Sequence, residues 1–117
     1  MVSYSAIVEG IGASEMIVSS QTLPRLYSFT AELGKVTREV KTEESVYKMK
    51  RARYMVCANS SGTVSLKDPR SLRTEHTFIA HTARLVDLDV CGELVATCGF
   101  SQRFVWCLHI NAMNLVL

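Results

Sequence analysis

The sequence is poor in the residues that interrupt regular secondary structure. Its 117 residues include two prolines and six glycines, while 48% of them are hydrophobic and 21% are charged. This composition excludes a low-complexity or disordered chain, in which proline, glycine and charge dominate. A chain of this length has room for one domain. We therefore expect a single folded unit with a hydrophobic core.

The sequence also lacks a strong charge excess and a long apolar run. Thirteen Lys and Arg against eleven Asp and Glu give a net charge of +2, whereas dedicated nucleic-acid binders are usually more basic. No run approaches the roughly 18 apolar residues of a membrane-spanning helix. The N-terminus has neither the basic start nor the apolar core of a secretory signal. These absences predict a cytoplasmic protein without a membrane partner.

Cysteine spacing excludes the common zinc and redox motifs. Cys57, Cys91, Cys98 and Cys107 are separated by 34, 7 and 9 positions, so no CxxC pair exists. Each cysteine lies in or beside an apolar run, where a free thiol behaves as a small hydrophobic residue. We expect buried structural thiols, and we expect no metal or other cofactor.

A repeat of 39 residues predicts the fold. The segments that begin at Glu15, Tyr54 and Glu93 each carry two bulky apolar residues followed by small ones, and each begins 39 positions after the last. The same step joins Ile7, Val46 and Leu85, and it joins Leu33 to Leu72. Several coincidences at one period indicate a structural repeat.

Short strands account for the pattern within each repeat. Val86, Leu88 and Val90 alternate with Asp87 and Asp89, which is typical of a strand with one buried face. We expect strands at 2–8, 15–20, 25–30 and 35–42, at 45–50, 54–59, 63–68 and 73–79, and at 85–90, 93–98 and 103–109. The segment 39–53 is also a fair helix former, so a short helix there is the alternative. The apolar end, 113–117, is left without an expected neighbour.

Turn residues are clearest in the second repeat. Gly62 is free to take a positive φ in one tight turn, and Pro69, after Asp68, presets φ in the next. Four short strands per roughly 40 residues match one blade of a WD40-like β-propeller. We therefore predict an all-β chain, a partial propeller of about three antiparallel four-stranded blades with the last one incomplete. The expected units cover about 1–43, 44–83 and 84–117.

Residues 59–101 resemble one propeller family in particular. The runs 61–72, 75–78, 85–90 and 97–101 are similar to the N-terminal propeller of the catalytic subunit of the poly(A) nuclease deadenylation complex. Relative to ordinary WD40 repeats, Lys67 replaces a Trp, and Ala80 precedes His81 where Gly-His is usual. These departures predict that the hydrogen-bonded network of typical WD40 repeats is broken.

The resemblance implies a scaffold rather than an enzyme. The family's full-length protein joins the propeller to a segment that binds a pseudokinase subunit, to an inactive ubiquitin-hydrolase-like domain and to a Mg-dependent 3′ exoribonuclease domain. This sequence resembles the propeller only and shows no constellation of four carboxylates for two Mg²⁺ ions. The resemblance therefore implies protein interaction in poly(A)-tail shortening and mRNA decay, with the pseudokinase subunit and messenger ribonucleoprotein as partners and P-bodies as the location.

The candidate site residues fall into a structural set and a basic cluster. The structural set holds turns and repeat positions: Gly62, Asp68, Pro69, His81, Asp89 and Gly99. The basic cluster contains Lys48, Lys50, Arg51 and Arg53. It has the charge to contact RNA phosphates or a partner protein, but no aromatic residues alternate with it on one face to stack bases. The purely structural interpretation of the basic cluster is a solvent-exposed turn without a binding role. Two alternatives for the chain stay open, namely an unrelated divergent WD40 adaptor and a small RNA-binding β-domain that uses the basic cluster.

Three further patterns have structural interpretations. His76 and His81 are five positions apart, so a continuous strand would point them to opposite faces, and we expect His81 to hydrogen-bond inside the blade. Asp87 and Asp89 match the polar face of a half-buried strand better than a Mg²⁺ site. The sequence has no Gly-x-Ser-x-Gly elbow, which argues against a hydrolase triad.

Overall fold

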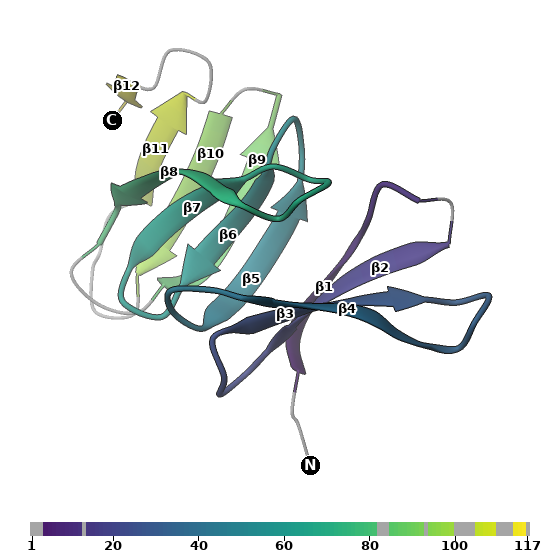
Figure 1. Cartoon of the computed structure of the whole chain (residues 1–117). Coiled ribbons are helices and arrows are strands. Elements are labelled where there is room, and N and C mark those ends of the chain that lie inside the picture. The colour runs from purple at the N-terminus through teal and green to yellow at the C-terminus, as the bar shows by residue number, and fades with distance from the viewer. Residues whose placement is uncertain are drawn as a thin grey trace.

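Antiparallel strands make up the computed structural model of the chain (Figure 1). It describes residues 4–12, 14–81, 85–92, 94–99, 105–109 and 114–116. Within these ranges no residue is helical, so the alternative of a helix in 39–53 was wrong. None of the described segments forms a helix long and apolar enough to span a membrane.

The strands form three sheets, which we call blades 1, 2 and 3. Blade 1 contains β1 (Tyr4–Glu9), β2 (Glu15–Ser20), β3 (Arg25–Thr30) and β4 (Lys35–Lys41). Blade 2 contains β5 (Val46–Arg51), β6 (Met55–Asn59), β7 (Thr63–Lys67) and β8 (Thr74–Ile79). Blade 3 contains β9 (Leu85–Cys91), β10 (Leu94–Gly99), β11 (Val105–His109) and β12 (Asn114–Val116). In each blade, neighbours in the sequence are neighbours in the sheet, because short turns join antiparallel strands.

The blades are arranged side by side around their first strands. β1 contacts β5, and β5 contacts β9, whereas β4 and β8 lie at the outer edges of their sheets (Figure 1). This radial order is typical of a propeller. It confirms the all-β, WD40-like fold predicted from the repeat.

The C-terminal end of blade 3 differs from the expectation. The apolar segment 113–117 was expected to lack a neighbour, but β12 pairs with β11, with Leu115 opposite Leu108. The unpaired edge of β11 offers backbone donors and acceptors, and an extended apolar segment satisfies them by adding a strand. The last blade therefore has a fourth strand, although it is only three residues long.

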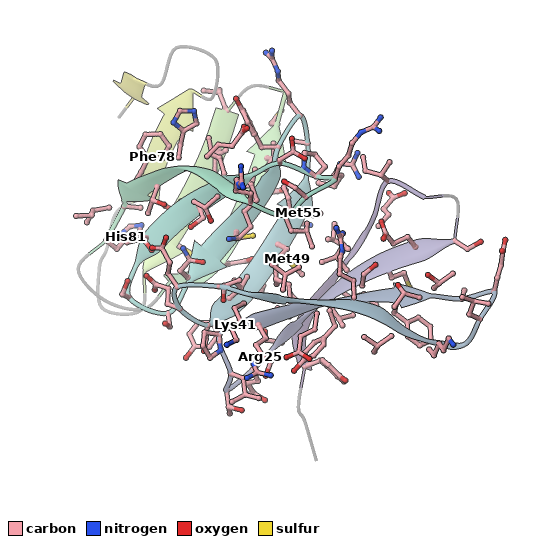
Figure 2. The ribbon with its side chains drawn as sticks, in the orientation of Figure 1. Arg25, Lys41, Met49, Met55, Phe78 and His81 are labelled. Atoms are coloured by element: carbon pink, nitrogen blue, oxygen red, sulfur yellow. The ribbon has the colours of Figure 1, made fainter. Side chains whose placement is uncertain are left out.

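Two apolar clusters hold the blades together. Between blades 1 and 2, Ile17 and Leu26 pack with Met49, Met55 and other residues of blade 2, and Figure 2 shows both methionines between the two sheets. A second cluster joins blade 2 to blade 3 through Val56, Val64, Leu66, Leu88 and Val95. Because β-strand side chains alternate between faces, one blade supplies residues to both clusters.

The described cysteines differ in how deeply they are buried. Cys57 is fully buried in the junction of blades 1 and 2, and burial raises the pKa of its thiol to about 12. Cys91 is exposed and Cys98 is only half-buried, so the expectation of buried thiols was wrong for these two. Cys98 lies opposite the exposed Asp87, on the face of blade 3 that points away from blade 2. The side chain of Cys107 lies outside the described residues.

Candidate interaction surfaces at the blade junctions

The turn between β6 and β7 anchors the segment that leads from blade 2 to blade 3. Gly62 has a φ of 100°, a conformation that strains residues with a Cβ. Its carbonyl oxygen accepts hydrogen bonds from the backbone N–H groups of Ala80 and His81, at 3.1 and 3.0 Å. The glycine turn therefore fixes the point at which the chain leaves blade 2.

His81 connects two blades. Its side chain, labelled in Figure 2, is 2% exposed. Its Nε2 lies 3.0 Å from Thr97 Oγ1 in β10. One link from a histidine to a hydroxyl on a neighbouring blade is thus present, despite the Ala80 and Lys67 departures from the WD40 pattern. Thr97 was not singled out in the sequence, because its role depends on the blade-to-blade contact.

The turn between β7 and β8 is stabilised by a carboxylate. Asp68 Oδ1 accepts hydrogen bonds from the N–H groups of Arg70 and Ser71, at 2.8 and 3.0 Å, with Pro69 between. These backbone donors lower the pKa of Asp68. The turn ends at Leu72, which has a φ of 62° and is buried in the junction with blade 1.

Glu44 caps the turn between β6 and β7, and sequence reasoning missed it. Its carboxylate accepts hydrogen bonds from Ser61 N (2.8 Å), Ser61 Oγ (2.9 Å), Thr63 Oγ1 (3.1 Å) and Ser60 Oγ (3.3 Å). Burial raises the pKa of Glu44, but these donors outweigh burial and bring the pKa below its ordinary value. The donor-rich run of two serines, Gly62 and a threonine was the available signal, but the carboxylate reaches it from a separate loop.

The basic cluster is distributed over both faces of its strand. Lys48 and Lys50 are exposed and share the face of β5 that points toward blade 3. Arg51 pairs with Met55 on the opposite face and is half-buried, and its Nε has no hydrogen-bond partner among the described residues. Arg53 is exposed in the following loop. Only the two lysines thus share a strand face, and the predicted contact with RNA or a partner stays a prediction.

The remaining sequence candidates lie mostly on blade 3. Asp87 and Asp89 are exposed, and each carboxylate accepts a hydrogen bond from the N–H of the next residue. Gly99 ends β10 at a register shift opposite Leu85.

His76 lies between the rings of Tyr54 and Phe78 in blade 2. In the described part of the chain, no three His, Cys, Asp or Glu side chains are grouped in a way that would hold a metal ion.

One face of blade 1 leaves apolar side chains uncovered. Ile7, Met49 and Leu88 hold the same place in their blades, since each lies opposite the equivalent position of the second strand. Met49 is 4% exposed and Leu88 is 3% exposed, because a preceding blade covers each of them, whereas Ile7 is 60% exposed. Tyr4 is likewise 54% exposed, and its equivalent Val46 is 1% exposed. This uncovered face has the composition of a blade junction.

The register corrects two of the repeat coincidences. Ile7 corresponds to Met49 rather than to Val46, because the loop between β1 and β2 is longer than the loop between β5 and β6. Leu33 is 62% exposed and does not match the buried Leu72. Gly34 matches Leu72 instead, since both have positive φ and both donate to the carbonyl four residues earlier.

Comparison with known proteins places this geometry in a family. The family model described as PAN2 N-terminal matches residues 29–113. The chain belongs to this family. It is 32% identical over 101 residues to the PAN2-PAN3 deadenylation complex catalytic subunit of Gallus gallus, which covers 86% of this chain and 8% of that protein. It is 51% identical over 51 residues to the Mus musculus subunit, which covers 44% of this chain and 4% of that protein.

Solved structures agree with this assignment. The Neurospora crassa Pan2 WD40 domain superposes with a TM-score of 0.87 at 25% identity, over 97% of this chain and 39% of that chain. The RRP9 WD40 repeats superpose with a TM-score of 0.84 at 13% identity, which shows a shared fold alone. This chain thus spans less than a tenth of its curated Pan2 relatives, and the region matched is their N-terminal WD40 region. The resemblance inferred from residues 59–101 is confirmed.

Proposed function

We propose that this Pan2-family chain is a non-catalytic interaction module that helps assemble a deadenylation complex. The observation that carries the proposal is the match of residues 29–113 to the PAN2 N-terminal family. Relatives in this family are named as catalytic subunits of the PAN2-PAN3 deadenylation complex. We assign this chain a scaffold role in poly(A)-tail shortening and mRNA decay, in the cytoplasm and its P-bodies.

The described residues support docking rather than chemistry. His81, Glu44 and Asp68 each use their polar side chains to hold turns or blades in place. The uncovered face of blade 1 is apolar, and large apolar patches on a protein surface are typical of contacts with other polypeptides. The partners that we propose are the pseudokinase subunit of the complex and proteins of the messenger ribonucleoprotein.

The response of binding to salt tests this proposal. We would titrate the 117-residue chain with the purified pseudokinase subunit and, separately, with a poly(A) oligonucleotide, between about 50 and 200 mM salt. The expected result is binding to the protein that changes little with salt and is unaffected by the double variant Lys48→Ser with Lys50→Ser. Salt-sensitive binding to poly(A) alone, lost in the double variant, would instead support the RNA-binding β-domain.

A further inference from the structure

A polar groove of about 540 Å³ lies between the end of β4 in blade 1 and the β7–β8 turn of blade 2. Its walls are joined by a hydrogen bond of 2.7 Å from Arg38 Nη1 to the carbonyl oxygen of Arg70. Lys41 reaches the groove from the last position of β4, where it pairs with Arg25 (Figure 2). Its lining includes the cations Lys41, Lys67 and Arg73, the hydroxyls of Ser71 and Thr74, and the carboxylate of Glu43.

Lys67 is the unusual member of this groove. The residue is only 4% exposed, and its Nζ donates a hydrogen bond of 2.6 Å to Thr74 Oγ1. An ammonium group has three N–H donors, and the described residues supply no other hydrogen-bond acceptor and no carboxylate partner for it. Glu43 and Glu44 line a cavity beside Lys67 but form no ion pair with it, and a buried charge without an ion pair is costly. Lys67 is therefore suited to an anion that enters the groove.

The surrounding side chains keep donors available for such an anion. Thr74 Oγ1 accepts the hydrogen bond from Lys67, so its hydroxyl proton remains available to donate. Lys41 and Arg73 are exposed and form no ion pair among the described residues. Two nearby carboxylates, Asp68 and Glu44, are instead occupied by turn N–H and hydroxyl groups.

We propose that this groove binds a phosphate monoester. Among the described residues that line it, three cations exceed one carboxylate by two charges, which suits a group that carries about −1.5 to −2 charges near neutral pH. Lysine, arginine and hydroxyl donors are the usual partners of phosphate oxygens, and the groove volume lies within the range of small-ligand sites. None of the described residues that line the groove is aromatic, so a nucleotide base would have none of them to stack on. The phosphate group, rather than a base, is the recognised part.

Ligand-dependent thermal unfolding of the 117-residue chain tests this site. We would titrate inorganic phosphate, O-phosphoserine and adenosine monophosphate, each against sodium chloride at the same ionic strength. The unfolding midpoint is expected to rise with the concentration of all three, and to follow its logarithm above the dissociation constant, because a ligand that binds the folded state alone stabilises it. The rise with the nucleotide should be no larger than that with phosphoserine, since the base adds no contact.

Matched variants separate the site from general charge effects. Lys67→Met keeps an unbranched side chain one atom shorter and without the charge, and should weaken the apparent phosphate affinity by about tenfold or more. Lys35→Met, at the far end of β4 and outside the groove, should leave the affinity unchanged. If Lys67→Met does not fold, Arg73→Gln at an exposed position provides the same comparison, with a smaller loss expected.

Three outcomes would overturn the proposal. The first is the absence of any midpoint shift by phosphate beyond that of chloride, and the second is an equal shift in the wild-type chain and in the groove variants. The third is stabilisation by adenosine monophosphate without stabilisation by phosphate or phosphoserine, which would indicate that a base is recognised elsewhere.

Discussion

Truncation of equivalent residues in neighbouring blades should have very different consequences. Met49 and Ile7 hold the same position in blades 2 and 1, but Met49 is 4% exposed and Ile7 is 60% exposed. Met49→Ala removes a side chain from the closed junction and should lower the free energy of unfolding by about 2–5 kcal/mol. Ile7→Ala removes a mostly solvated side chain and should change it by less than about 0.5 kcal/mol.

Urea unfolding followed by circular dichroism measures both changes. For a domain of this size, 1 kcal/mol corresponds to about 4 °C in the thermal midpoint, so Met49→Ala should also lower that midpoint by about 8–20 °C. Leu88→Ala, at the same position in blade 3 and 3% exposed, serves as a second buried case. An Ile7→Ala variant as destabilised as Met49→Ala at every protein concentration would refute the assignment of Ile7 to an uncovered face.

The remaining predictions concern a turn, a carboxylate, assembly and catalysis. Gly62→Val should destabilise the chain by about 1–3 kcal/mol in the same urea assay, because Gly62 has a φ of 100°. An unchanged midpoint would contradict this. Donors in the β6–β7 turn hold the pKa of Glu44 below 4.5, so its stabilisation is present above that pH and is lost as the pH falls through the lowered pKa. Glu44→Gln should therefore flatten the acid limb of the stability profile, and an unaltered limb would show that the cap contributes nothing. The wild-type chain should self-associate in a light-scattering concentration series through the face that contains Ile7, and Ile7→Glu should reduce this association. A monodisperse 13.0 kDa wild-type monomer would count against it. The purified chain should not shorten poly(A) with Mg²⁺ present, and shortening abolished by a chelator would disprove this.

The positions of the strands were largely predictable from the sequence. Alternation of apolar and polar residues is a local property, so Val86 to Val90 indicated β9 without knowledge of any other blade. The step of 39 holds between the second strands of blades 1 and 2, where Met16 and Met55 occupy equivalent positions. From blade 2 to blade 3 the step is 40, since Cys57 lies opposite Met49 and Thr97 lies opposite Leu88. Gly62 was predictable for the same reason, since the turn it forms requires a positive φ within a few residues of chain.

The tertiary structure decided the register of the blades and the environment of the side chains. Loop length moved Ile7 into register with Met49, which a fixed period does not reveal. Glu44 and Lys67 acquired their surroundings from segments distant in the chain, and Thr97 did so from the neighbouring blade. Burial and hydrogen bonding depend on which faces meet in space, whereas strand propensity and turn chemistry depend on adjacent residues. For that reason the sequence alone determined the blades, and only their packing determined which positions are junctions, which are grooves and which remain uncovered.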